Sequence, residues 1–324
     1  FIFKYGFLFF DWAILKASFT AKTADYCPKN GACWAFIRER LEQILYGFYP
    51  KKEVYRVNIF LGLTIISLGS ALKYPHRIGR FSCLWLFILL PSLSIFLLRG
   101  LEPILNTVES SLWGGILLSF LIALTSICLS LPFGIILALM RRSKSFMLRT
   151  CSICFIELWR GVPLITVLFM SSVMLPLFLP EGFYINKLLR ALIAVTFFAS
   201  AYMAEVIRGG LQALAKGQTE ASQSLGLNYF QTQRFVILPQ ALRHVIPGIV
   251  NTFIGLFKDT SLVSIIGMFD LMGVIQAAST DPKWLGHLLE GYLFAAFFYW
   301  SICFSMSRYS QGLEKKLQRG QSHV

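Results

Sequence analysis

Ionisable residues at helical spacing occur at the ends of two apolar stretches of this chain. Glu157 and Arg160 lie three residues apart, and Glu205 and Arg208 repeat that spacing in the next apolar stretch. Residues three apart share one face of a helix, so the members of each pair can neutralise each other. Because an unpaired charge inside a bilayer is costly, each of these side chains must meet a partner, water or the membrane surface.

Two interpretations of these pairs stay open. They pack and anchor helices at a membrane boundary, or they line a gate or a path for a substrate that carries opposite charges. Lys258 and Asp259 present the same choice, although adjacent residues project about 100° apart on a helix and do not face each other. For this pair, a contact with another helix or subunit is favoured over ligand binding.

Residue types for catalysis or metal binding do not converge in the sequence. The four histidines show no H-E-x-x-H spacing, and there is no G-x-x-x-x-G-K-[ST] loop. Cys151 and Cys154 have no second ligand pair nearby, so we interpret them as packing residues. We therefore expect no enzyme, no metal site and no cofactor. If ATP powers the protein, another chain must bind it.

Cys27 and Cys33 differ from the other five cysteines because they lie in a polar segment, YCPKNGACW. The other five lie within or against apolar stretches, where cysteine is a small packing side chain. If the polar segment faces the periplasm, Cys27 and Cys33 are expected to form a disulfide.

The elements that position these residues are predicted to be helices in a membrane. Of the 324 residues, 56% are hydrophobic and only 14% are charged, against roughly 25% charged in a soluble domain. The net charge of +14 sits in short loops, where membrane orientation explains it better than a nucleic-acid partner does. The sequence predicts an all-α integral membrane protein with about eight transmembrane helices and no bound nucleic acid.

Seven apolar stretches are predicted to cross the membrane, since roughly 20 helical residues span a bilayer. The opening residues form a weaker eighth span, because Lys4, Asp11 and Lys16 interrupt them. The chain begins with Phe rather than Met, which indicates that its true start is missing. The seven predicted spans are Val57–Leu72, Phe81–Leu98, Leu112–Met140, Gly161–Pro180, Ala191–Ala204, Val245–Phe257 and Gly291–Ser307.

Basic residues are concentrated in alternate loops, which predicts the orientation. One set of loops holds 15 Lys and Arg residues and the alternating set holds 4, and the basic set is expected in the cytoplasm. Residues 21–56 disagree, with seven basic residues on the assigned outer side, and we interpret them as a small translocated insertion. The basic set comprises residues 73–80, 141–149, 208–243 and 308–324, and the other set 99–111, 180–190 and 270–290.

A polar segment, EASQSLGLNYFQTQRFVILPQA, interrupts the apolar pattern. It predicts a short helix over Gln218–Leu225, with Glu220 in the first turn, where a negative charge suits the helix dipole. Gly226 suits a left-handed helix end. Asn228 is then expected to cap a second short helix that Pro239 stops. The segment is therefore predicted to be a bent helix pair on the cytoplasmic face.

This segment resembles the signature of type-1 ATP-binding-cassette (ABC) importer permeases, which is EAA, three residues, G, nine residues and I-x-L-P. Ser222 replaces the second alanine and Val236 the isoleucine. By this resemblance, the segment docks into a cleft on an ATPase subunit and transmits its movement. The coupling residues carried over are Glu220, Ala221, Gly226, Leu238 and Pro239.

Further stretches are similar to the polar amino-acid branch of these permeases, the histidine, glutamate and general L-amino-acid family. They are IELWRGVPLITVLFM, SAYMAEVIRGGLQALAKGQTEA and FKDTSLVSIIG. GACWAFIRERLEQILYGFYP most resembles the M-type permease of the general L-amino-acid importer of Gram-negative bacteria.

The resemblance predicts the domain organisation. An N-terminal extension over 1–109 carries about three transmembrane helices and a periplasmic insertion at 21–56. A type-1 permease domain over 110–309 contains the last five helices as its core and the coupling segment 217–241. A cytoplasmic tail over 310–324 follows.

The resemblance implies a multi-pass subunit, in the bacterial inner membrane, of an ATP-driven importer of polar or general L-amino acids. The implied partners are two copies of an ATPase subunit, a second homologous permease, a periplasmic amino-acid-binding protein, the L-amino-acid substrate and the lipid bilayer. The alternative is an ion-coupled secondary amino-acid transporter, which would more often show an inverted repeat and would need no docking segment. The amino acids carried, the subunit that holds them and the choice between homodimer and heterodimer stay open.

Overall fold

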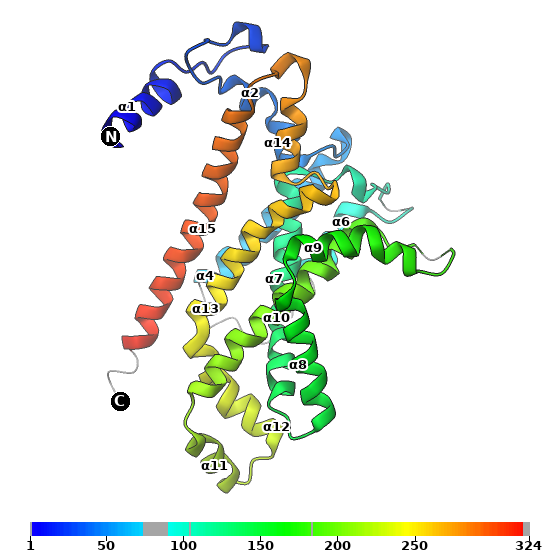
Figure 1. Ribbon diagram of the computed structural model, residues 1–324, viewed down its shortest axis with the longest axis vertical. Coiled ribbons are helices and arrows are strands. Elements are labelled where there is room, and N and C mark those ends of the chain that lie inside the picture. The colour runs from blue at the N-terminus through cyan, green and yellow to red at the C-terminus, as the bar shows by residue number, and fades with distance from the viewer. Residues whose placement is uncertain (1, 74–89, 104, 183, 320–324) are drawn as a thin grey trace. The chain divides into compact units, whose positions relative to one another are not determined.

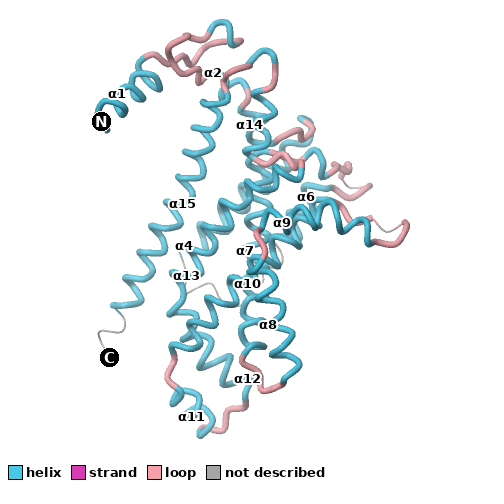
Figure 2. The backbone as a smooth tube through the Cα atoms, in the orientation of Figure 1, coloured by secondary structure: helices cyan, strands magenta, loops and turns pink. Residues whose placement is uncertain are grey.

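The computed structural model describes residues 2–73, 90–103, 105–182 and 184–319. Most of these residues are helical and none of them lies in a β-strand, as Figure 2 shows, so the predicted all-α fold is confirmed. The helices are α1 (Ile2–Phe10), α2 (Ala35–Glu39), α3 (Leu41–Tyr46), α4 (Val54–Lys73), α6 (Leu90–Arg99), α7 (Gly115–Arg141), α8 (Phe146–Gly161), α9 (Leu164–Phe169), α10 (Lys187–Ala213), α11 (Lys216–Ser224), α12 (Tyr229–Gln231), α13 (Leu238–Asp259), α14 (Leu271–Ser279) and α15 (Leu288–Arg319).

Among the described residues, four helical stretches are long and apolar enough to cross a membrane. A fifth crossing is counted when Phe146–Gly161 and Leu164–Phe178, which are bent by 102°, are taken as one broken span. The predicted span Gly161–Pro180 corresponds to the second arm of this pair, which begins at Leu164. Val162 is extended because the ring of Pro163 disfavours a helical residue before it. The four stretches are Gly115–Arg141, Lys187–Ala213, Tyr229–Ile266 and Leu288–Lys315.

The membrane spans predicted near the N-terminus agree with the helices of the structure to different degrees. Helix α4 covers Val57–Leu72. Helix α6 covers the end of Phe81–Leu98, and the start of that predicted span lies outside the described residues. The opening stretch contains a shorter apolar helix, Tyr5–Leu15.

The chain divides into two compact units, each with its own core. In the first unit, the rings of Phe36 and Trp284 lie 5.8 Å apart in a cluster with Ile44 and Leu271. This cluster joins α2 and α3 to α14 and to the turn before α15. The first unit comprises Phe1–Ile122 with Thr260–Ser301, and the second Ala123–Asp259 with Ile302–Val324.

Helix α10 is the central helix of the second unit and packs along α13 and α8 (Figure 1). A Cβ added at Gly210 of α10 would lie 2.6 Å from the carbonyl oxygen of Ala241 on α13. One added at Gly248 of α13 would lie 3.0 Å from a methyl carbon of Val206. Small residues therefore let these two helix backbones approach closely.

Candidate functional site

The predicted bent helix pair is present, and we call residues 216–237 the elbow. It comprises α11, a turn at Gly226, α12 and the π-helical turn Thr232–Ile237. Gly226 has a φ of +77°, so the predicted left-handed helix end is confirmed. Asn228 accepts a hydrogen bond from the Gln231 backbone N–H while the Gln231 side chain accepts one from the Asn228 N–H, both at 2.9 Å. This reciprocal pair is a capping box, and it confirms the predicted cap.

Two details of the predicted elbow are wrong. Helix α11 begins at Lys216, because the backbone is extended only as far as Ala215, so Glu220 lies beyond the first turn. Pro239 does not stop the second helix, since α13 runs on from Leu238 to Asp259. Proline removes one intrahelical hydrogen bond. The wider π-helical turn Thr232–Ile237 precedes it and accommodates the proline ring, so the helix continues.

A buried hydroxyl pair joins the two arms of the elbow. Ser222 and Thr232 are 3% and 1% exposed, and their side-chain oxygens are hydrogen-bonded at 3.2 Å. Serine in place of the second alanine of the signature thus keeps the small size needed for this contact and adds a polar link. The sequence did not single out Thr232, because only the fold brings it back onto α11.

Several large apolar side chains of the elbow are exposed. Leu225 and Phe230 are 81% and 83% exposed, and Tyr229 and Phe235 are also exposed. Ile237, by contrast, is buried in the core of the second unit with residues of α10 and α13. The elbow therefore combines exposed apolar side chains with a buried contact to α10 and α13. The coupling role carried over to Glu220, Ala221, Leu238 and Pro239 stays a prediction.

Glu205 is the centre of a cluster of charged side chains. Its carboxylate lies 2.7 Å from Arg141, 2.7 Å from Arg208 and 3.6 Å from Arg160. Glu157 lies 3.1 Å from Arg141. The predicted pairing of Glu205 with Arg208 is confirmed. Glu157 and Arg160 do not pair with each other, because each has its ion-pair partner on another helix.

Arg141 is the member of this cluster that the sequence did not indicate. It stands at the end of α7 and bridges Glu157 of α8 and Glu205 of α10. Three guanidinium groups meet two carboxylates, so the cluster carries one surplus positive charge and ties three helices together. Removing the partly buried Glu205 would leave Arg160 and Arg208 without this carboxylate partner. A role of these residues in a substrate path or gate stays a prediction.

Lys258 and Asp259 do not join this cluster. They end α13, where Lys258 is exposed and Asp259 partly buried. Eleven residues, or roughly 16 Å of helix, separate Asp259 from Gly248, which packs beside Val206 next to Glu205. Their role as a helix or subunit contact, or in ligand binding, stays a prediction.

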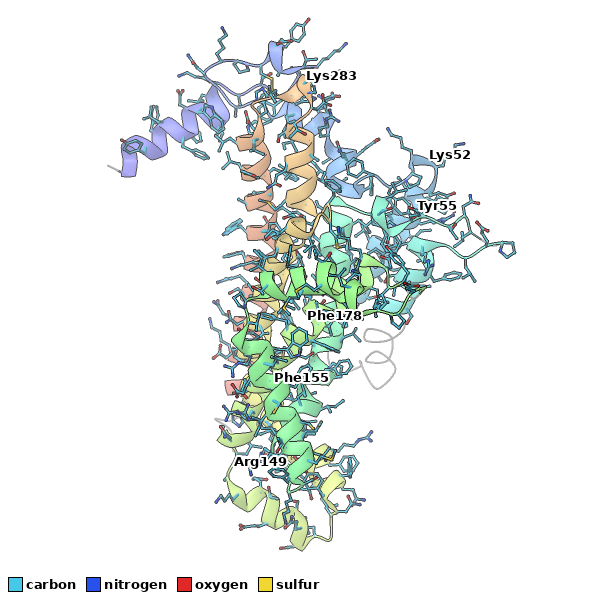
Figure 3. All side chains as sticks on the ribbon, turned by 45° about the vertical axis from the view of Figure 1, so that its right-hand side comes forward. Lys52, Tyr55, Arg149, Phe155, Phe178 and Lys283 are labelled. Carbon is cyan, nitrogen blue, oxygen red and sulfur yellow. A yellow bond between two sulfur atoms is a disulfide. The ribbon has the colours of Figure 1, made fainter. Side chains whose placement is uncertain are left out.

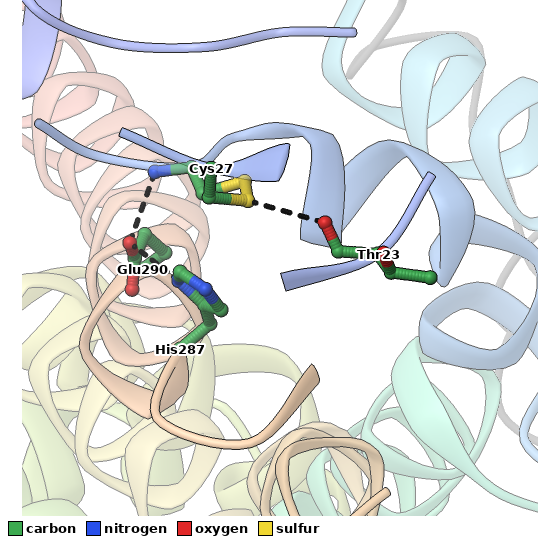
Figure 4. The surroundings of a disulfide bond; sticks show 5 residues. Thr23, Cys27, His287 and Glu290 are labelled. Atoms are coloured by element: carbon green, nitrogen blue, oxygen red, sulfur yellow. Dashed lines mark hydrogen bonds and ion pairs between the residues drawn. A yellow bond between two sulfur atoms is a disulfide. The ribbon is translucent and has the colours of Figure 1, made fainter. Parts of the chain in front are cut away.

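Cys27 and Cys33 form a disulfide in the first unit (Figure 4). Glu290, only 4% exposed, accepts a hydrogen bond from the Cys33 backbone N–H at 3.0 Å and lies 3.1 Å from Nδ1 of His287. We call the disulfide with His287 and Glu290 the clasp, since it fixes the disulfide loop to the start of α15. The two sulfur atoms and a His287 nitrogen lie within 4.8 Å of one another, but thiolates rather than disulfide sulfurs bind metals.

Comparison with known proteins identifies the family. Residues 130–319 match the family described as "binding-protein-dependent transport system inner membrane component", over more than half of the chain. This chain belongs to that family. The permease is 54% identical to the inner membrane amino-acid ABC transporter permease protein YhdY of Escherichia coli K12, over 96% of this chain and 85% of that protein. It is 42% identical to the glutamate/glutamine/aspartate/asparagine transport system permease protein BztC of Rhodobacter capsulatus, over 90% of this chain and 80% of that protein.

The fold of the permease also has a solved counterpart. A crystal structure of an amino acid ABC transporter with histidines is similar with a TM-score of 0.55 and 28% identity, over 62% of this chain and 92% of that one. Family membership confirms the resemblance to binding-protein-dependent importers and the multi-pass location in the inner membrane. It contradicts the alternative of an ion-coupled secondary transporter.

Proposed function

We propose that this permease carries amino acids into the cell as a membrane subunit of an ATP-driven importer. The similarity to two amino-acid permeases over most of their lengths supports the cargo class. The observation that carries the proposal is the elbow, an internally hydrogen-bonded helix pair that exposes Leu225 and Phe230. Large apolar side chains on a firm support are typical of a surface that another protein covers.

The elbow is attached so that its movement reaches the membrane helices. Ile237 at its end is 3% exposed and packs with Leu211 of α10 and Ala241 of α13. An ATPase subunit that pulls on the exposed apolar side chains would therefore move α10 and α13 together. Such a movement exchanges inward for outward access to the substrate, and the coupling acts in both directions.

The proposed partners are those that the family resemblance implies. The importer would contain two ATPase subunits, a second permease of the same family and a periplasmic binding protein that delivers polar amino acids. The charge cluster around Glu205 would hold α7, α8 and α10 in one arrangement at the predicted cytoplasmic end. Opening a path there would require some of these ion pairs to exchange partners.

Co-purification tests the proposal. Tagged permease extracted from native membranes in mild detergent should bring down an ATPase subunit and a second permease. The double variant Leu225→Ser with Phe230→Ser should lower ATPase recovery roughly tenfold, because it removes the apolar contact area. Leu285→Ser with Tyr184→Ser, at side chains that are 68% and 83% exposed outside the elbow and outside the candidate membrane spans, is the matched control and should leave recovery unchanged. A permease that imports amino acids alone into liposomes would overturn the proposal.

A further inference from the structure

A pocket lined mainly by arginines lies in the second unit where α7 turns into α8. It has a volume of about 370 Å³. Among the described residues, no carboxylate lines the pocket. The carboxylates that contact its arginines, Glu157 and Glu205, are already paired in the Glu205 cluster. The lining residues are Arg141, Arg142, Ser143, Arg149, Ile153, Arg208 and Gln212.

The polar side chains of this pocket present donors. Arg149 is exposed, with no carboxylate partner among the residues that the structure describes, and it stands in the first turn of α8 (Figure 3). The side-chain oxygen of Gln212 accepts a hydrogen bond from Arg208 at 2.9 Å, so its NH₂ group is left to donate. Ser143 accepts from the Ser145 backbone N–H at 3.2 Å, which leaves its hydroxyl hydrogen to donate. Guanidinium groups with amide and hydroxyl donors are the groups that bind phosphate.

The pocket is bordered by apolar side chains that face outward. Phe146 and Met147, in the turn before Arg149, are 82% and 74% exposed, and Leu148 is exposed as well. α7 is a candidate membrane span that ends at Arg141, so the pocket lies at the predicted cytoplasmic boundary of the bilayer. A free phosphate ion would gain nothing from this apolar border, whereas the acyl chains of a lipid would cover it.

We propose that this pocket binds the phosphate of an anionic phospholipid headgroup, with the acyl chains lying over the exposed first turn of α8. This role goes beyond transport itself and does not depend on the identity of the cargo. Arg141 and Arg208 belong both to the pocket and to the Glu205 cluster. A bound headgroup would therefore reinforce the links among α7, α8 and α10 and stabilise the arrangement seen here.

Lipid binding to the purified complex tests this proposal. Native mass spectrometry and thermal unfolding in neutral detergent would be measured with added phosphatidylglycerol, phosphatidylcholine or inorganic phosphate. Phosphatidylglycerol is expected to bind and to raise the unfolding temperature, and the other two are expected to have little effect. Arg142→Gln with Arg149→Gln should weaken phosphatidylglycerol binding by roughly tenfold or more, because two charge-assisted contacts are lost.

A matched variant separates the pocket from general surface charge. Lys144→Gln with Arg243→Gln removes the same charge from exposed residues that do not line the pocket, and it should bind the lipid like the parent. Equal lipid affinity of the parent and the pocket variant would overturn the proposal, and so would equal loss in both variants. Equal stabilisation by inorganic phosphate would overturn the lipid assignment. Loss of the ATPase subunit from the pocket variant, with lipid affinity unchanged, would mark the pocket as a protein contact instead.

Discussion

The clasp and the elbow are both short segments rich in polar residues, but different interactions fix their conformations. In the clasp, a disulfide closes the loop covalently, and the buried Glu290 carboxylate accepts a hydrogen bond from the Cys33 N–H and contacts His287. In the elbow, the turn at Gly226 and the Asn228 cap fix the backbone, while the largest side chains stay exposed. The clasp is closed by contacts within the chain, whereas the elbow exposes apolar side chains that we propose another molecule covers.

The largest effect is expected at the turn of the elbow. Gly226→Val places a β-branched residue at a φ of +77°, a conformation that costs L-residues about 1–2 kcal/mol or more. A Cβ there would meet nothing within 4 Å, so the backbone conformation is the whole cause. Amino-acid uptake by cells should fall at least roughly tenfold, with the permease still inserted in the membrane.

Gly217→Ala is the matched control for this variant. Gly217 lies within α11, and an added Cβ would also meet nothing within 4 Å. Uptake by this variant should equal that of the parent. If Gly226→Val imports normally, the elbow does not need its bend and the comparison with the clasp fails.

Asp270, a buried helix cap in the same unit as the clasp, should make the free energy of unfolding depend on pH. Asp270 is fully buried, accepts a hydrogen bond from the Gly273 N–H at 2.9 Å and caps α14. Burial raises the pKa of Asp270 to about 6, against about 3.9 in an unfolded chain. The unfolded state therefore ionises first, so this group lowers the stability of the fold as pH rises from about 4 to 6, and the loss persists at higher pH.

Asp270→Asn keeps a cap acceptor and carries no charge. Its free energy of unfolding should exceed that of the parent by up to about 3 kcal/mol near pH 8. The two proteins should become similar near pH 4. Thermal unfolding of the purified permease across this pH range measures the difference, and a difference that does not change with pH would contradict the assignment.

The disulfide of the clasp should matter for stability more than for transport. Replacing both Cys27 and Cys33 with serine opens a loop closed over a sequence separation of 6, which should lower the free energy of unfolding by about 2 kcal/mol. Uptake at moderate temperature should persist. Serine at Cys151 and Cys154, which are free and exposed rather than packed as predicted, is the control and should leave unfolding unchanged. Alkylation of both Cys27 and Cys33 without reductant would show that no bridge forms.

The smallest effect is expected at the cap of the elbow. Asn228→Ala removes one side of the capping box and should cost about 1 kcal/mol of local helix stability. Because the cap is exposed, uptake should fall only a few-fold, far less than with Gly226→Val. Asn228→Asp keeps an acceptor and should restore uptake. A loss as large as that of the glycine variant would show that the cap, rather than the turn, controls the bend.

The sequence by itself determined the features that depend on local chemistry. Apolar stretches gave the long helices, Gly226 gave the left-handed turn, and Asn228 gave the cap, since each rests on the conformation or hydrogen bonding of neighbouring residues. The signature around Glu220 also pointed to the family that residues 130–319 match.

Only the tertiary structure decided which distant side chains meet. Arg141 lies between Glu157 and Glu205 because helices from separate parts of the chain pack together, and Thr232 meets Ser222 because the turn at Gly226 folds the two arms of the elbow onto each other. The helix also continues past Pro239, since the π-helical turn before it accommodates the proline and α13 packs closely against α10. A pattern along the chain reports spacing within one helix, whereas ion pairs and hydrogen bonds between helices depend on how those helices pack.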